Sequence, residues 1–321
     1  MRVPRVLTVL VSLFILSCSG GDDGKKSDSG PPATDGAAGA SLVGTFQVSV
    51  VGPDTSAGTT GSTTVFGKVY DGPTPSAEIW EEAATDGACK LLKPRIPFCE
   101  TPCGGSAICV DDGKCQSYPK EVTVGTVHLE GVHTESGETK ISMDPVAQNY
   151  QPVGVTLSYP PFSEGDEIKL TADGEPKLTA TAKGISPLVL ESAPLQLETG
   201  KSATLTWTAP KQSGLARIKV KLDISHHGGT KGKIECDTDD SGSLELTATL
   251  LDQLQALGVA GFPTVAVTRE TSGSAPAEVG KVDLVINSRV EQEVVIPGLV
   301  SCNDDSDCPS GQTCQTDLRC K

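Results

Sequence analysis

Aromatic residues and long apolar runs are both scarce in this sequence. Phe, Trp and Tyr make up 4% of the 321 residues, so any hydrophobic core has to be built from Val, Leu and Ile with few large rings. The N-terminal apolar run, residues 6–16, is interrupted only by Thr8 and Ser12. It is too short for a transmembrane helix, which needs about 20 residues.

Basic residues are also few relative to acidic ones. Lys and Arg number 26 against 41 Asp and Glu, which gives a formal net charge of −15. So acidic a chain repels phosphate backbones, and we therefore expect no nucleic-acid partner. The 35 Gly and 22 Pro residues indicate many turns, and together with the low aromatic content they favour short strands over long helices.

The motifs that usually carry catalysis are missing. No Gly-x-Ser-x-Gly segment occurs, so a hydrolase of that class would have no nucleophile. His128 and His133 are not spaced for a helical metal pair, and the adjacent pair at 226–227 is typical of a loop tip. Residues 228–233 resemble a phosphate-binding loop only faintly, because Ile234 stands where Ser or Thr would bind magnesium. We predict no catalytic residue and no cofactor.

Two acidic segments have oxygen atoms at spacings that could suit calcium. Asp237, Asp239 and Ser241 match the opening of a calcium loop, but Ala248 occupies the position of the closing Glu. A second acidic cluster contains Asn303, Asp304, Asp305 and Asp307. We expect acidic turns and no metal ion at either place, with weak calcium binding as the alternative.

The N-terminus has the order of parts found in an export signal. Arg2 and Arg5 precede the apolar run, which ends in Ile15-Leu16-Ser17-Cys18. This ending resembles the lipobox of bacterial lipoprotein precursors. The resemblance implies that residues 1–17 are a lipoprotein signal peptide, and that Cys18 carries fatty acyl chains such as palmitate and anchors the chain to a membrane. An ordinary secretory signal with a chance cysteine is the alternative.

A tether is predicted directly after the anchor. Residues 19–41 contain no Val, Ile, Leu, Met or aromatic residue and are rich in Gly, Ser, Asp and Ala. Such a segment cannot bury enough apolar surface to offset the entropy of ordering, so we expect residues 18–41 to be disordered. Ser19 follows the anchor where Asp would favour inner-membrane retention in enteric lipoproteins. We therefore expect an outer-membrane location, on the periplasmic face or the cell surface.

Alternation of apolar and polar residues dominates the rest of the chain. Residues 216–224 place Ile and Val on one face and charged residues on the other, which predicts a half-buried strand. Hairpins are predicted around Asp173-Gly174 and around residues 287–289. A leucine stripe from Leu246 to Leu257, followed by Gly258, predicts one short helix.

The predicted fold is mainly β, with two β-sandwich domains. The best boundary is Tyr159-Pro160-Pro161, which separates a first β domain (42–158) from a second, immunoglobulin-like sandwich (159–300). A cysteine-rich insertion occupies residues 86–119 of the first domain, and a cysteine-rich tail occupies 301–321.

Ten cysteines follow Cys18, and an exported chain should pair them as disulfides. Two segments share Cys-x5-Cys-x5-Cys spacing and suggest small disulfide-dependent modules rather than zinc sites. If the four cysteines of the tail close among themselves, the cluster of five has one odd member, whose natural partner is Cys236. The ten are Cys89, Cys99, Cys103, Cys109, Cys115, Cys236, Cys302, Cys308, Cys314 and Cys320.

Taken together, the lipobox, tether, β domains and cysteine repeats resemble surface lipoproteins of gliding Gram-negative bacteria. That likeness implies no particular activity. We expect a lipid-anchored envelope or surface protein with a non-catalytic binding or structural role towards a protein or glycan partner. The alternative is a hydrolase that acts on an envelope polymer through paired carboxylates. A pocket with two convergent carboxylates would favour the hydrolase, and open, wet sheet faces would favour binding.

Overall fold

Alternating side chains build one large curved sheet. The computed structural model describes residues 41–53, 58–276 and 278–321. The expected signal peptide, Cys18 and residues 18–40 of the tether therefore lie outside the described residues. The eleven strands of the sheet follow the order β10 (Asn149–Tyr150), β2 (Ser62–Tyr70), β1 (Leu42–Val51), β19 (Gly280–Val295), β18 (Thr264–Ser274), β15 (Arg217–Asp223), β16 (Lys233–Asp239), β4 (Cys89–Arg95) and β3 (Ile79–Asp86), with β7 (Glu121–Val122) beside β2 and β13 (Leu195–Gln196) beside β19.

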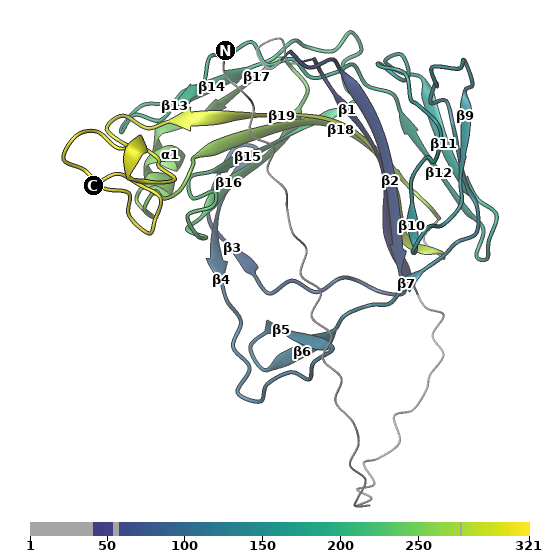
Figure 1. The fold of residues 1–321 in the computed structure, drawn as a ribbon, viewed down its shortest axis with the longest axis horizontal. Helices are drawn as coiled ribbons and strands as arrows, with labels where there is room; N and C mark the ends of the chain where they lie inside the picture. The colour runs from purple at the N-terminus through teal and green to yellow at the C-terminus, as the bar shows by residue number, and fades with distance from the viewer. Residues whose placement is uncertain (1–40, 54–57, 277) are drawn as a thin grey trace, which may run out of the picture. The chain divides into compact units, whose positions relative to one another are not determined.

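Smaller elements cover one face of this sheet (Figure 1). A four-stranded antiparallel sheet and a two-stranded sheet with helix α1 lie on that face, and a disulfide-rich hairpin forms a separate two-stranded sheet. Their bounds are β12 (Leu178–Lys183), β11 (Glu167–Ala172), β8 (Val127–Glu130) and β9 (Lys140–Met143); β14 (Ala203–Thr206), β17 (Ser243–Leu246) and α1 (Ala248–Gln255); and β5 (Ala107–Asp111) with β6 (Lys114–Ser117). The fold is therefore mainly β with disulfide-rich segments, as predicted.

Two hydrophobic cores lie side by side under the covered face. Strand β19 contributes to both, because Val282, Leu284 and Ile286 belong to the first core and Val294 belongs to the second. The four-stranded sheet closes the first core, and α1 closes the second with Leu250, Leu251 and Leu254. Gly273 lets β18 approach β12, since a Cβ atom there would lie 1.7 Å from the carbonyl oxygen of Thr181.

The domain boundary expected at Tyr159 is not present in the structure, because neither the large sheet nor the first core divides there. Strands β1 and β2 precede it in sequence, yet they share the large sheet with β15, β18 and β19, which follow it. The first core likewise draws residues from both sides of position 159. The described residues belong to one compact unit.

The local predictions have mixed outcomes. The hairpin around Asp173-Gly174 is confirmed, because β11 and β12 pair antiparallel across it. The hairpin predicted at residues 287–289 is wrong, because these residues lie inside the continuous strand β19. The helix is confirmed but shorter than its leucine stripe, since Leu246 ends β17 and Gly258 has a positive φ of 92° beyond α1. No helix within the described ranges has the length and hydropathy to span a bilayer.

One connection crosses the open side of the sheet. Strands β2 and β3 follow each other in sequence but lie near opposite ends of the sheet, so residues 71–78 have to pass across the uncovered face (Figure 1). The return connection runs beside them, with the amide of Asp71 donating to the carbonyl of Lys120 at 3.0 Å. The disulfide-rich hairpin β5–β6 belongs to this return connection, which joins β4 to β7.

Candidate functional site

The uncovered face of the large sheet carries polar side chains from five neighbouring strands. Side chains alternate across a strand, so the residues between the core positions point to the opposite face. On β15 these are Arg217, Lys219 and Lys221, which lie between the buried Ile218, Val220 and Leu222. The same alternation on the neighbouring strands presents Glu235 and Asp237, Thr268 and Glu270, Asn287, Arg289 and Glu291, and Gln47 and Ser49.

Three adjoining cavities hollow this face. A cavity of about 400 Å³ lies where β15, β18 and β12 meet, one of about 530 Å³ lies over β15, β16 and β18, and one of about 600 Å³ lies over β18, β19 and β1. Neighbouring cavities share lining residues, Lys219 and Asp237 between the first two, and Thr268 and Arg289 between the last two. We call this continuous hollow the concave face.

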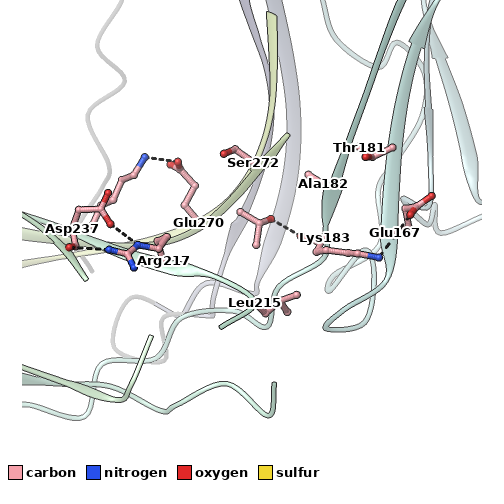
Figure 2. Close-up of a pocket in the computed structure, with 11 residues that line it drawn as sticks. Glu167, Thr181, Ala182, Lys183, Leu215, Arg217, Asp237, Glu270 and Ser272 are labelled. Atoms are coloured by element: carbon pink, nitrogen blue, oxygen red, sulfur yellow. Dashed lines mark hydrogen bonds and ion pairs between the residues drawn. The ribbon is translucent and has the colours of Figure 1, made fainter. Parts of the chain in front are cut away.

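The carboxylates that line the concave face are all paired with cations. Asp237 lies 2.7 Å from Arg217, Glu270 lies 2.5 Å from Lys219, and Glu167 lies 3.7 Å from Lys183. Figure 2 shows the pairs Asp237–Arg217 and Glu167–Lys183 on opposite sides of the cavity where β15, β18 and β12 meet. The hydrogen bond that Arg217 donates to Asp237 raises the pKa of the Arg217 guanidinium.

The two remaining carboxylates of these cavities are paired as well. Glu235 lies 2.6 Å from Lys233, and Glu291 is bonded to Arg289. Glycoside hydrolysis needs one carboxyl group kept protonated beside a second that is ionised. Each carboxylate of the lining therefore lies beside a cation, which favours its ionised form, and the lining does not offer an acid and base pair.

A serine–histidine–aspartate contact lies on the outer face of the four-stranded sheet. Nδ1 of His128 is 2.8 Å from Oγ of Ser142, and Nε2 is 2.9 Å from Asp173. The histidine contact lowers the pKa of Asp173. His128 and Ser142 are directly opposite each other on β8 and β9, and Ser142 is exposed and lines none of the cavities described above. We assign the contact to cross-strand pairing rather than to a nucleophilic triad.

The other histidines do not form a site with these residues. The ring centroids of His226 and His227 are 3.9 Å apart in the loop between β15 and β16. His227 has a positive φ of 62°, so the alternation that separates neighbouring side chains on a strand does not apply there. His133 contributes its backbone, whose amide donates to the carbonyl of Pro161 at 2.8 Å.

The acidic segments considered for calcium use their oxygens elsewhere. Asp237 and Asp239 lie on β16 and both bind Arg217, so they do not form the opening of a calcium loop. In the tail, the carboxylates bond backbone amides. Asp305 accepts from the amide of Cys314 at 2.7 Å, and Asp304 accepts from the amide of Ser306 at 2.8 Å. The hydroxyl of Ser306 also donates to Asp304, and this bond, followed by the amide bond, lowers the pKa of Asp304. These contacts are those of acidic turns and helix caps.

The ten cysteines within the described residues are all paired. Cys236 bonds Cys89, which confirms the partner predicted from parity, and Cys99–Cys109 and Cys103–Cys115 close the insertion. Cys302–Cys314 and Cys308–Cys320 close the tail. Both modules connect their first cysteine to the third and their second to the fourth. The sulfur atoms that cluster within 4.8 Å in each module are therefore oxidised rather than available as thiolate ligands.

No family model matches the chain, and no curated protein matches it either. The concave face was not identifiable from single residues in the sequence. Its charged residues lie up to about 200 positions apart, from Lys90 to Glu291, and only the alternation on β15 indicated a polar face in advance.

Proposed function

We propose that this protein is a lipid-anchored envelope or surface protein that binds a protein or glycan partner through its concave face and carries out no catalysis. The outer membrane is the proposed location. Ten cysteines in five disulfides support an oxidising compartment, because thiols stay reduced in the cytosol. The lipobox-like ending at Cys18 supports attachment to a membrane by fatty acyl chains.

The observation that carries the binding role is the open concave face with all five of its lining carboxylates paired to cations. The central strands of this face are hydrogen-bonded to a neighbouring strand on each side, so their side chains are held in defined positions, which suits recognition. A hydrolase acting on an envelope polymer is the second candidate. It would need two convergent carboxyl groups with separated pKa values, and each lining carboxylate is instead held beside Lys or Arg.

Site-specific cross-linking in intact cells tests the proposal. A photoreactive amino acid at Thr268, in the floor of the concave face, should yield a covalent adduct with an envelope component. The same amino acid at Thr139, which is exposed just before β9 and lines none of the three cavities, is the matched control and should yield none. Adducts of equal yield at both positions, or none at Thr268, would contradict binding by this face.

A second arm of the experiment tests the anchor. The Cys18→Ser variant should leave the membrane fraction and lose the Thr268 adduct, because acyl chains on Cys18 hold the protein beside its partner. Mass spectrometry of the wild-type N-terminal peptide should show the mass of the acyl chains. An unmodified Cys18 in membrane-bound protein would refute lipid attachment.

A further inference from the structure

We propose that the concave face binds an acidic saccharide chain, with carboxylate or phosphate groups held by Lys219, Lys221, Arg289 and Lys90. This inference rests on the proposed binding function and names the class of its ligand. It depends on three features of the face, namely a floor of small side chains, a local excess of cations and a fully paired backbone.

The floor of the central cavity is low because β18 carries small residues there. Ala266 and Thr268 face the hollow, while β15 on one side carries Lys219 and Lys221, and β19 on the other carries Arg289. Long side chains flank short ones, which produces a trough of about 530 Å³. A ligand lying in this trough would contact cations from both sides.

The central cavity is the cationic part of an acidic protein. Its lining includes four cations, Lys90, Lys219, Lys221 and Arg289, and two anions, Glu235 and Asp237, whereas the whole chain has a net charge of −15. The four cationic side chains are 49–56% exposed. Their partner carboxylates are 16–48% exposed, but each cation keeps half of its surface in solvent, so the anionic groups of a ligand can approach it from the hollow and share it with the protein's own carboxylate.

A saccharide fits this face better than a peptide does. Strands β15, β18 and β19 are paired on both sides, so their backbone groups cannot accept an added strand. The adjoining cavity presents amide and hydroxyl groups from Gln47, Ser49 and Asn287. Such groups both donate and accept hydrogen bonds, as the hydroxyls of a sugar do.

The hollow is long enough for a chain of sugars. It extends from β16 through β15, β18 and β19 to β1, and four strand spacings of about 4.8 Å give about 19 Å. A ligand that spans this length runs across the strands. Its end over β15 and β16 would contact the cations, and its end over β1 would contact the amide and hydroxyl groups.

Calorimetry on the mature, full-length protein in detergent tests the proposal. The probes are a polygalacturonate oligomer, an uncharged glucan of equal length and a polyglutamate peptide. We expect the acidic saccharide to bind at least tenfold more tightly than the other two, and its affinity to fall as salt is added. K219Q/K221Q should weaken its binding at least tenfold, and K219R/K221R should restore it.

The matched control removes two paired lysines elsewhere. Lys201 pairs with Glu198, and Lys321 pairs with Asp317, both away from the concave face, so K201Q/K321Q makes the same change in net charge. Its affinity should stay within twofold of the wild type. Equal losses in both double variants, equal binding of the uncharged glucan, or tighter binding of polyglutamate would each overturn the acidic-saccharide proposal. If these tests fail while Thr268 still yields a specific adduct, binding by the concave face stands and only its ligand is wrong.

Discussion

At the scale of single residues, the most informative contact is a buried ion pair between the two cores. Arg269 and Asp240 are 1% and 0% exposed and lie 2.5 Å apart. The guanidinium also donates to the carbonyl of Thr208 at 2.7 Å, and the indole of Trp207 donates to Asp240 at 2.7 Å. Every charged atom of this pair has partners, which is the condition under which a buried pair is tolerated.

We predict that Arg269→Met destabilises the fold strongly. It leaves the Asp240 carboxylate buried without its cation, and breaking such a pair costs about 3–5 kcal/mol. The free energy of unfolding in urea measures the loss. The matched control is Arg217→Met, whose salt bridges to Asp237 and Asp239 are exposed, and it should lose much less stability. A loss below about 1 kcal/mol for Arg269→Met would contradict the role given to the pair.

The sequence indicated the disulfide of Cys236 but not the ion pair of Arg269. If the four tail cysteines close among themselves, parity predicts a partner for Cys236 among the five cysteines from Cys89 to Cys115, and Cys89 is that partner. Arg269, by contrast, falls on the core face of β18 among Val265 and Val267, where sequence alone marks it only as an exception to the alternation. Its acidic partner lies on another segment and comes close only through the arrangement of the sheets.

At the scale of elements, the error at residues 287–289 has a physical reason. The polar triplet Asn287-Ser288-Arg289 lies between two largely apolar segments, and in the sequence it therefore resembles a turn. Ser288 is 1% exposed, and its hydroxyl accepts a hydrogen bond from the amide of Leu188 at 2.9 Å. The polar interruption marks the point where one long strand passes from the first core to the second. A strand shared by two cores has no distinct signature in its own residues.

A two-residue turn offers a test of local conformation. Ala147 and Gln148 have positive φ values of 46° and 58°, and Val146 and Asn149 exchange both backbone hydrogen bonds across them. This geometry is that of a type I′ hairpin, which favours Asn-Gly. We predict that A147N/Q148G stabilises the protein by roughly 1–2 kcal/mol, because the left-handed region costs about that much for other residues.

The melting temperature and urea unfolding of A147N/Q148G measure this gain. Gln312→Gly is the matched control, since Gln312 is exposed directly after a turn, donates its amide to the carbonyl of Pro309, and is not among the residues with positive φ. It should leave stability unchanged or lower it slightly, because glycine adds freedom to the unfolded chain. Equal shifts in the two variants would show that the turn is not strained.

At the scale of the whole described unit, the chain does not divide at one point. The predicted β class, disulfide-rich segments and short helix follow from composition, alternation and cysteine spacing, which are local properties. The shared sheet does not, because β1 pairs in parallel with β19 about 240 residues later, and β4 lies beside β16. Strand order over such separations depends on the packing of the whole unit, and the concave face exists only because of that order.

The disulfide between Cys89 and Cys236 is the covalent link across that arrangement. It joins adjacent strands β4 and β16 and closes a loop of 147 residues. The chain-entropy model gives about 5 kcal/mol for a loop of this length, as an upper figure, and about 3 kcal/mol for one near the 12 residues of Cys308–Cys320. We predict that C89A/C236A lowers the free energy of unfolding in urea more than the matched control C308A/C320A does. The difference arises because the first disulfide restrains half of the unfolded chain, whereas the second restrains a short segment of the tail. Equal losses would mean that the long-range disulfide adds no more than a local one, and that β3 and β4 are held at the edge of the sheet by strand pairing alone.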